Sequence, residues 1–153
     1  MPLETPKRPE GTASNEVQDF VTAQEDNFRR RMLNPVEEAR HRNDFRSALK
    51  HLSQLTQQVA PGDLMTEIGQ LQQTVVNEWA EFHTAQVQRT LQSLRPGDDP
   101  ARLLEPREEL QEILTQKPPL AARLAQPVRS LIDQIDRQRL QRRLTEATQA
   151  RDH

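Results

Sequence analysis

Apolar residues recur at helical spacing through the middle of the chain. Between residues 64 and 94 they follow one another mainly in steps of four and three, and the row consists of Leu64, Ile68, Leu71, Val75, Phe82 and Ala85. This is the heptad spacing of a helix that packs against other helices. The pattern therefore predicts one long central helix over residues 64–94, about 45 Å long at roughly 1.5 Å per residue.

Two further helices are predicted on the N-terminal side of the central helix. The first covers residues 15–33, where the apolar residues at helical spacing are Val17, Phe20, Val21 and Phe28. Asn34-Pro35 is expected to end this helix, because a residue that precedes proline is disfavoured in the helical conformation. The second covers residues 36–59. It is expected to end at the sequence APGD, in which Asp63 would cap the central helix.

The C-terminal part of the chain also reads as helical. The sequence RPGDDP at residues 95–100 is a turn, with Asp99 as the cap and Pro100 as the first residue of a short helix. Pro118-Pro119 is expected to break the chain again. The last helix is predicted over residues 120–148, and Pro127 is expected to kink or split it.

Strand signals are missing from the sequence. No stretch alternates apolar and polar residues over four or more residues that favour strands, and tyrosine is absent. The predicted fold class is all-α, a helical bundle or coiled-coil-like assembly with a long central helix. Residues 1–14, rich in proline and charge, are expected to form a disordered N-terminal arm. Residues 15–94 would then be a glutamine-rich, coiled-coil-like region, and residues 95–153 a helical C-terminal region.

The composition suggests that these helices do not satisfy one another within one chain. Only 33% of the residues are hydrophobic and 3% are aromatic, against roughly 45–50% apolar residues in typical globular domains. We therefore expect self-association, so that the chain forms a dimer or a larger homo-oligomer. The expected self-association residues are Leu64, Ile68, Leu71, Val75 and Phe82. Trp79, the only tryptophan, is either a core residue or an anchor for a partner protein.

Arginine-rich segments raise the alternative of a nucleic-acid-binding or regulatory protein. In the segment RQRLQRR the candidates for contact with nucleic acid are Arg137, Arg139, Arg142 and Arg143, because guanidinium groups bind phosphates in a bidentate manner. The formal net charge of the chain is -2, and no aromatic residues are interleaved with the arginines to stack on bases. Ordinary solvated helix faces or ion pairs between helices are the favoured interpretation of these arginines.

Few residues in the sequence suggest a catalytic, cofactor-binding or metal-binding site. The chain has no cysteine and four isolated glycines, so neither a thiolate site nor a phosphate-binding glycine loop is expected. Glu38 and His41 in the sequence EARH have the spacing of a metal-binding pair on a helix, but the motif occurs only once and a solvated face is favoured. We expect a non-enzymatic protein without catalytic, cofactor or metal-binding residues. No apolar run reaches membrane-spanning length and no signal sequence is evident, which indicates a cytoplasmic location without membrane contact.

The layout of the chain resembles the McdB family, adaptors that work with a ParA-type ATPase to space carboxysomes in cyanobacteria. The resemblance rests on the basic, proline-containing segment PLETPKRPEG, the glutamine-rich segments LSQLTQQV and GQLQQTVV, and a helical C-terminal part. It implies an oligomeric adaptor in carboxysome positioning, with Lys7 and Arg8 as candidates for contacting the ATPase. Pattern and resemblance thus favour a self-associating helical adaptor that also binds a second protein through its N-terminal arm or its exposed helix faces.

Overall fold

The structure, a computed structural model, describes residues 10–151, with side chains from residue 15 onward. These residues form five α-helices and one 3₁₀ helix: α1 (Glu10–His41), α2 (Phe45–Gln58), α3 (Asp63–Ser93), η1 (Pro100–Leu103), α4 (Leu104–Leu114) and α5 (Ala122–Arg151). No strand occurs in this range, so the all-α prediction is confirmed. Of the expected arm, residues 1–9 lie outside the described range and α1 begins at Glu10. Lys7 and Arg8 are therefore not described.

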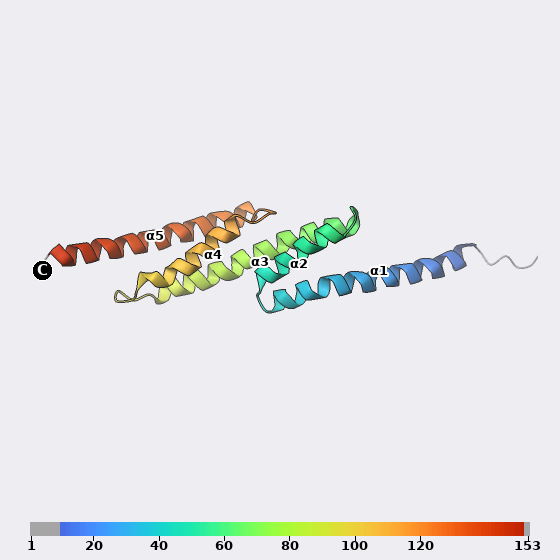
Figure 1. The fold of residues 1–153 in the computed structure, drawn as a ribbon, viewed down its shortest axis with the longest axis horizontal. Coiled ribbons are helices and arrows are strands. Elements are labelled where there is room, and N and C mark those ends of the chain that lie inside the picture. Colours follow the sequence, from blue (N-terminus) through green and yellow to red (C-terminus); the bar gives the residue numbers. More distant parts are fainter. Residues whose placement is uncertain (1–9, 152–153) are drawn as a thin grey trace, which may run out of the picture.

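Consecutive helices run in opposite directions and are shifted along one another, so that the chain forms an elongated zigzag (Figure 1). The long central helix α3 contacts α2 along its N-terminal part and both α4 and α5 along its C-terminal part. Helix α1 packs on α2 near its own C-terminal end. Because of the shifts, the N-terminal part of α1 and the C-terminal part of α5 project as single helices at opposite ends of the molecule.

The core follows α3, whose buried residues come from neighbouring rows of one side: Ile68, Val75, Val76, Trp79, Ala80, His83 and Val87. Phe45 of α2 and Phe82 of α3 pack ring against ring, with centroids 5.7 Å apart. The buried residues of α2, α4 and α5 join the same cluster, so one continuous core serves the whole zigzag. None of the helices within residues 10–151 has an apolar stretch that would reach across a membrane.

The predicted helix break at Asn34-Pro35 is wrong, because α1 continues through Pro35. Of the two outcomes expected at Pro127, a kink or a split, the split does not occur, because α5 continues through this residue. A proline inside a helix removes one backbone hydrogen bond to the carbonyl four residues earlier. Those carbonyls belong to Arg31 and Arg123, and both arginines and both prolines are exposed, so solvent has access to both sites. Each helix therefore tolerates its proline.

The break that does occur in this region lies between α1 and α2, within the segment for which the sequence predicts one helix over residues 36–59. Asn43 adopts a positive φ of 57°, a conformation that asparagine tolerates better than most residues. Asp44 then caps α2, because its carboxylate accepts hydrogen bonds from the backbone N–H of Ser47 at 3.3 Å and from the Ser47 hydroxyl at 2.8 Å. The resulting sharp turn lets α2 fold back along α1.

The turns at APGD, RPGDDP and Pro118-Pro119 lie where the sequence predicts them. Gly62, rather than Asp63, is the capping residue of α3. Asp99 caps η1 by accepting a hydrogen bond from the Ala101 backbone N–H at 2.9 Å, as predicted. These turns set the helix lengths, and the helix lengths decide which parts of α1 and α5 extend past their neighbours.

Candidate protein-interaction site

The heptad row of α3 is used within the chain itself. Ile68 and Val75 are fully buried, while Leu64, Leu71 and Phe82 are half-buried and pack against the same core. The fully buried Ile68 and Val75 cannot meet a second copy unless the fold opens, whereas the half-buried Leu64, Leu71 and Phe82 keep part of their surface exposed. Most of the row expected to mediate self-association therefore packs within the single chain, and a fully uncovered apolar surface lies elsewhere.

Trp79 belongs to the core, which decides between the two interpretations of this residue. Its side chain is only 2% exposed, and its indole Nε1 donates a hydrogen bond to Glu109 Oε1 of α4 at 3.1 Å. The guanidinium carbon of Arg46 lies 5.3 Å from the centroid of the tryptophan ring, within the range of a cation–π contact. Trp79 thus joins α2, α3 and α4 and is not available to anchor a partner.

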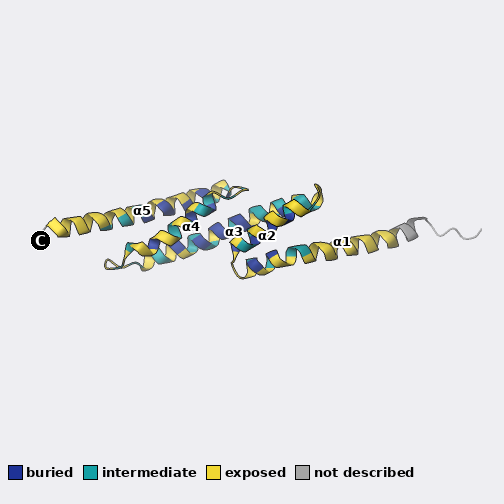
Figure 2. Cartoon of the chain, in the orientation of Figure 1, coloured by how far each residue is buried: buried dark blue, intermediate teal, exposed yellow. Residues whose placement is uncertain are grey.

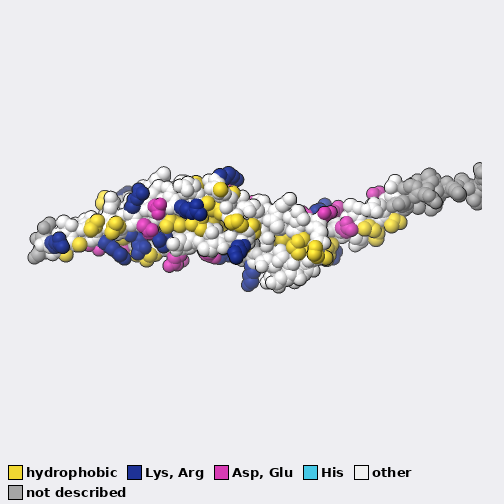
Figure 3. Space-filling view, turned by 90° about the horizontal axis from the view of Figure 1, so that it is seen from above, with side chains coloured by type: hydrophobic (Ala, Val, Ile, Leu, Met, Phe, Trp, Pro, Cys, Tyr) yellow, Lys and Arg dark blue, Asp and Glu magenta, His cyan; other side chains and the backbone are white. Residues whose placement is uncertain are grey.

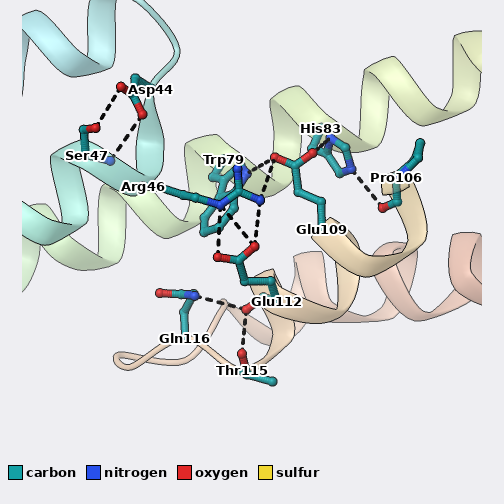
Figure 4. Close-up of polar contacts among 10 residues, drawn as sticks. All are labelled: Asp44, Arg46, Ser47, Trp79, His83, Pro106, Glu109, Glu112, Thr115 and Gln116. Carbon is teal, nitrogen blue, oxygen red and sulfur yellow. Dashed lines mark hydrogen bonds and ion pairs between the residues drawn. The ribbon is translucent and has the colours of Figure 1, made fainter. Parts of the chain in front are cut away.

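Polar side chains surround Trp79 and connect the same three helices (Figure 4). Arg46 of α2 donates from Nε and Nη2 to both carboxylate oxygens of Glu112 in α4, at 2.7 to 3.1 Å. These hydrogen bonds hold the pKa of Glu112 below its ordinary value and raise the pKa of Arg46. The carboxylate of Glu109 lies 3.6 Å from Arg46 Nη2. The cluster therefore acts as a polar clamp between α2 and α4 across α3.

His83 completes this clamp on the side of α4. The ring is buried, with Nδ1 at 2.9 Å from Glu109 Oε2 and Nε2 at 3.1 Å from the carbonyl oxygen of Pro106. A carbonyl oxygen only accepts hydrogen bonds, as does an ionised carboxylate, so a ring that carries both protons donates to both partners. His83 is thus bound within the fold, and its role in this arrangement is to hold α3 against α4.

Glu38 and His41, the pair with metal-like spacing in the sequence, lie on the exposed side of α1. Asn34 Nδ2 donates to Glu38 Oε1 at 3.4 Å, and both Glu38 and His41 are exposed. Within residues 10–151, no group of three or more His, Asp or Glu side chains lies close enough to hold a metal ion. These two residues form a solvated helix face.

One of the candidate nucleic-acid residues of α5, Arg142, is already hydrogen-bonded within the fold. Arg142 donates to Glu146 Oε1 at 3.3 Å and also to the carbonyl oxygen of Pro96. Its guanidinium thus ties the projecting part of α5 to the loop that follows α3. A guanidinium held by two acceptors has fewer donors left for a phosphate.

Two of the remaining arginines of this segment, Arg139 and Arg143, lie near one acidic residue, Asp136. Arg139 and Arg143 border a shallow hollow together with Asp136. Arg107 of α4 donates to both oxygens of Asp136, at 2.6 and 3.2 Å, and these hydrogen bonds hold the pKa of Asp136 below its ordinary value. Arg137 is exposed. On the face seen in Figure 3, Lys and Arg side chains are interspersed with Asp and Glu, which is typical of solvated surfaces with ion pairs.

An uncovered apolar row lies on the projecting part of α1. Every residue from 15 to 31 is exposed (Figure 2), yet this stretch contains Val17, Phe20, Val21 and Phe28 at helical spacing. Val17 is 63%, Phe20 65% and Phe28 58% exposed. Hydrophobic side chains are visible along this part of the molecule in Figure 3. We call these four residues the α1 row.

The α1 row ends where α1 meets the rest of the fold. Arg29 forms an ion pair with Glu67 of α3 and lies 4.0 Å from Asp26 on its own helix. Next to this pair, a hollow of about 330 Å³ is bordered by Phe28 of the α1 row and by Leu64 at the start of α3. The projecting segment is thus fixed at its base and uncovered beyond it.

A second, smaller apolar pair projects at the opposite end of the molecule. Leu140 and Leu144 lie one turn apart on α5 and are mostly exposed. They lie in the second half of α5, towards the end of this helix that projects beyond the other helices in Figure 2. The single chain therefore leaves apolar residues uncovered at both of its ends, and the larger group is on α1.

No protein-family model, curated protein or solved structure matches this chain. The interpretation of the site therefore rests on the residues and their geometry.

The sequence predicts the α1 row as an apolar helix face, but it does not show that the folded chain leaves this face uncovered. The helical spacing of Val17, Phe20, Val21 and Phe28 predicts an apolar helix face as clearly as the spacing on α3 does. Which of the two faces the chain covers depends on where α2, α4 and α5 come to lie. The aromatic content of the α1 row is the one local hint, because two of the four phenylalanines in the chain lie in it.

Proposed function

We propose that this protein is a cytoplasmic, non-enzymatic helical adaptor, which associates with itself and with another protein through helix faces that its own fold leaves uncovered. The observation that carries the proposal is the α1 row, four apolar side chains on a helix segment that no other element among the described residues covers. Apolar anchors at such spacing are what an amphipathic helix presents when it lies in a groove or against another helix.

The free energy lost by leaving the α1 row in contact with water supports this assignment. Water contact with apolar surface costs roughly 25 cal/mol per Å², and a single helix in water is marginally stable at the length of this projection. Both costs fall when a second helix covers the row. Contiguous apolar surface on a monomer commonly marks an interaction site.

The identity of the second protein partner rests on the resemblance to McdB. Under that resemblance the partner is a ParA-type ATPase, the adaptor acts in carboxysome positioning, and contact is made through Lys7 and Arg8. The α1 row and the segment that contains Lys7 and Arg8 lie at the same end of the chain, so one end would serve both contacts. Binding of a ParA-type ATPase to the full chain, and its loss on changing Lys7 and Arg8 to Glu, tests this part of the proposal.

Measuring the mass of the full chain in solution tests self-association. The chain has a mass of 17.7 kDa, and we expect the apparent mass to rise above this value as the protein concentration increases. The variant Phe20→Glu with Phe28→Glu should remain at the monomer mass. A matched control, Asn15→Glu with Thr22→Glu, adds the same charge at exposed positions on the opposite side of α1 and should behave as the wild type. Equal masses for all three proteins would contradict the proposal.

The nucleic-acid alternative is tested by binding to duplex DNA and to RNA across a salt series. Because Arg142 is hydrogen-bonded to Glu146 and Arg139 and Arg143 lie near Asp136, we expect no tight, salt-sensitive binding. Strong binding at low salt that weakens steeply with added salt, and that is lost when Arg139 and Arg143 are changed to Gln, would favour the alternative.

A further inference from the structure

The charges of the projecting α1 segment are ordered along its length. Glu16 and Asp19 lie near the beginning of the described segment, and Arg29, Arg30 and Arg31 lie at its base. Arg29 is bound to Glu67. Among the described residues, no ion pair involves Glu16, Arg30 or Arg31. The segment thus carries acidic residues at its outer end and basic residues where it joins the rest of the fold.

We infer that two copies of this chain pair through their projecting α1 segments in antiparallel orientation. The inference rests on the proposed self-association and specifies its surface and direction. In this arrangement Val17 of one copy lies against Phe28 of the other, and Val21 lies beside Gln24. The contact spans the whole α1 row, which is about 16 Å long at roughly 1.5 Å per residue.

Charge complementarity favours the antiparallel orientation. Glu16 lies one turn before Phe20, at the edge of the α1 row, and Arg31, which lies one turn after Phe28, follows about four helical turns later at the same edge. In an antiparallel pair, equivalent edges of the two helices face each other, so Glu16 of each copy faces Arg31 of the other. A parallel pair in register instead places Arg31 beside Arg31. Exposed ion pairs add little affinity but select orientation effectively.

The base of the segment has room for the outer end of a second copy. The hollow beside Phe28 has a volume of about 330 Å³, and its remaining border is formed by Glu25, Asp26, Arg29, Asp63 and Leu64. Antiparallel pairing brings Val17 of the second copy to Phe28, at the mouth of this hollow. An apolar side chain there would cover Leu64, which the single chain leaves half-buried.

The area of the contact indicates a weak dimer. Phe20 is 65% and Phe28 58% exposed, and a phenylalanine ring buries roughly 150–250 Å². The four rings of a dimer thus cover roughly 350–600 Å², and the valines add less than the rings. Stable interfaces bury about 1,200–2,000 Å² in total. The pair therefore forms and separates with protein concentration.

A charge-exchange experiment on the full chain tests the inference. Glu16→Arg alone and Arg31→Glu alone each place like charges together twice in the antiparallel pair, and each should weaken dimerisation about tenfold by analytical ultracentrifugation at low salt. The double variant restores opposite charges and should recover the wild-type dissociation constant. Glu16 and Arg31 lie too far apart on one helix to touch, so recovery reports contact between copies. Asp19→Arg, which makes the same charge change on the far side of α1, is the control and should have little effect.

Cross-linking supplies an independent measurement, because the chain has no cysteine of its own. Mixing the variant Glu16→Cys with the variant Arg31→Cys should give a disulfide-linked dimer under mild oxidation. Either variant alone should give little, because its two thiols are about 20 Å apart in the antiparallel pair and a disulfide needs Cα atoms within roughly 7 Å. The variants change only exposed positions, and circular dichroism should show unaltered helicity.

The outcomes separate the inference from the proposed function. If the wild type self-associates but the double variant does not recover, or if each cysteine variant cross-links with itself, antiparallel α1 pairing is wrong while self-association stands. If the wild type keeps its monomer mass up to millimolar concentration, both are wrong. Recovery in the double variant together with cross-linking only in the mixture supports the inference.

Discussion

Changing Ile68 to alanine tests whether the heptad row of α3 stabilises the single chain or an interface between chains. The Ile68 side chain is fully buried in the structure. Removing its outer carbons loses their burial and leaves a cavity, and such substitutions cost about 2–5 kcal/mol. We expect about 3 kcal/mol here, a large fraction of the roughly 5–15 kcal/mol by which folded proteins are stable.

Urea unfolding followed by circular dichroism measures this loss. With a dependence of about 1–3 kcal/mol per molar urea for small proteins, the midpoint should fall by roughly 1–3 M. If the row is an intramolecular core, the midpoint of wild type and variant should not change between two low micromolar protein concentrations. Leu140→Ala is a matched control, because it also shortens an aliphatic side chain but at a mostly exposed position, and its midpoint should shift only slightly.

Two results would refute this reasoning. One is a midpoint that rises with protein concentration in the wild type and no longer does so in Ile68→Ala. The other is a variant that unfolds at the wild-type midpoint but has a lower mass in solution. Either result would mean that Ile68 lies between chains, as the heptad spacing alone suggests.

Three further predictions concern the polar clamp and a helix cap. Arg46 lowers the pKa of Glu112, so this pair stabilises the fold above the ordinary value of 4.5 and the stabilisation is lost as the pH falls through the lower folded pKa. Glu112→Gln should therefore weaken the dependence of the unfolding free energy on pH below about pH 5. The total effect should be less than about 1 kcal/mol, because both groups are partly exposed. The same dependence of the unfolding free energy on pH in wild type and variant would contradict this. Trp79→Phe removes the hydrogen bond to Glu109 and leaves space in the core, and should cost about 2–3 kcal/mol in urea unfolding followed by circular dichroism; a loss below about 0.5 kcal/mol would show that the clamp contributes little. Asp44→Ala should cost about 1 kcal/mol, whereas Asp44→Asn, which keeps an accepting oxygen, should cost less; equal losses would mean that the cap hydrogen bonds are not the cause.

The polar clamp illustrates what sequence patterns miss. Arg46, His83 and Glu112 are far apart in the chain and have no motif spacing, so no local pattern connects them. They meet because α2 and α4 both fold back against the same stretch of α3. The burial of His83 at a helical spacing from Trp79 was compatible with the sequence, but its two partners on α4 were not predictable from it.

Asn43 and Pro35 show where local rules fail in opposite directions. Proline carries a strong local penalty in helices, yet Pro35 remains within α1 because its surroundings are open to water. The sequence RND carries a weak signal, yet the chain turns there because α2 buries Phe45, Ala48, Leu52 and Leu55 only when it folds back. Packing over many residues outweighs a single backbone preference.

The sequence by itself determined that the chain is helical, where most of its turns lie, and which residues share a face on each helix. These properties depend on the helical repeat and on proline, glycine and capping residues, all of which act over a few neighbouring positions. Only the tertiary structure decided that the row of Ile68 and Val75 is covered while the row of Val17 and Phe20 is not. The two rows look alike along the chain, and the difference arises because helix lengths and turn positions together determine which segment lies over which. A local sequence pattern carries no information on how helix lengths and turn positions combine.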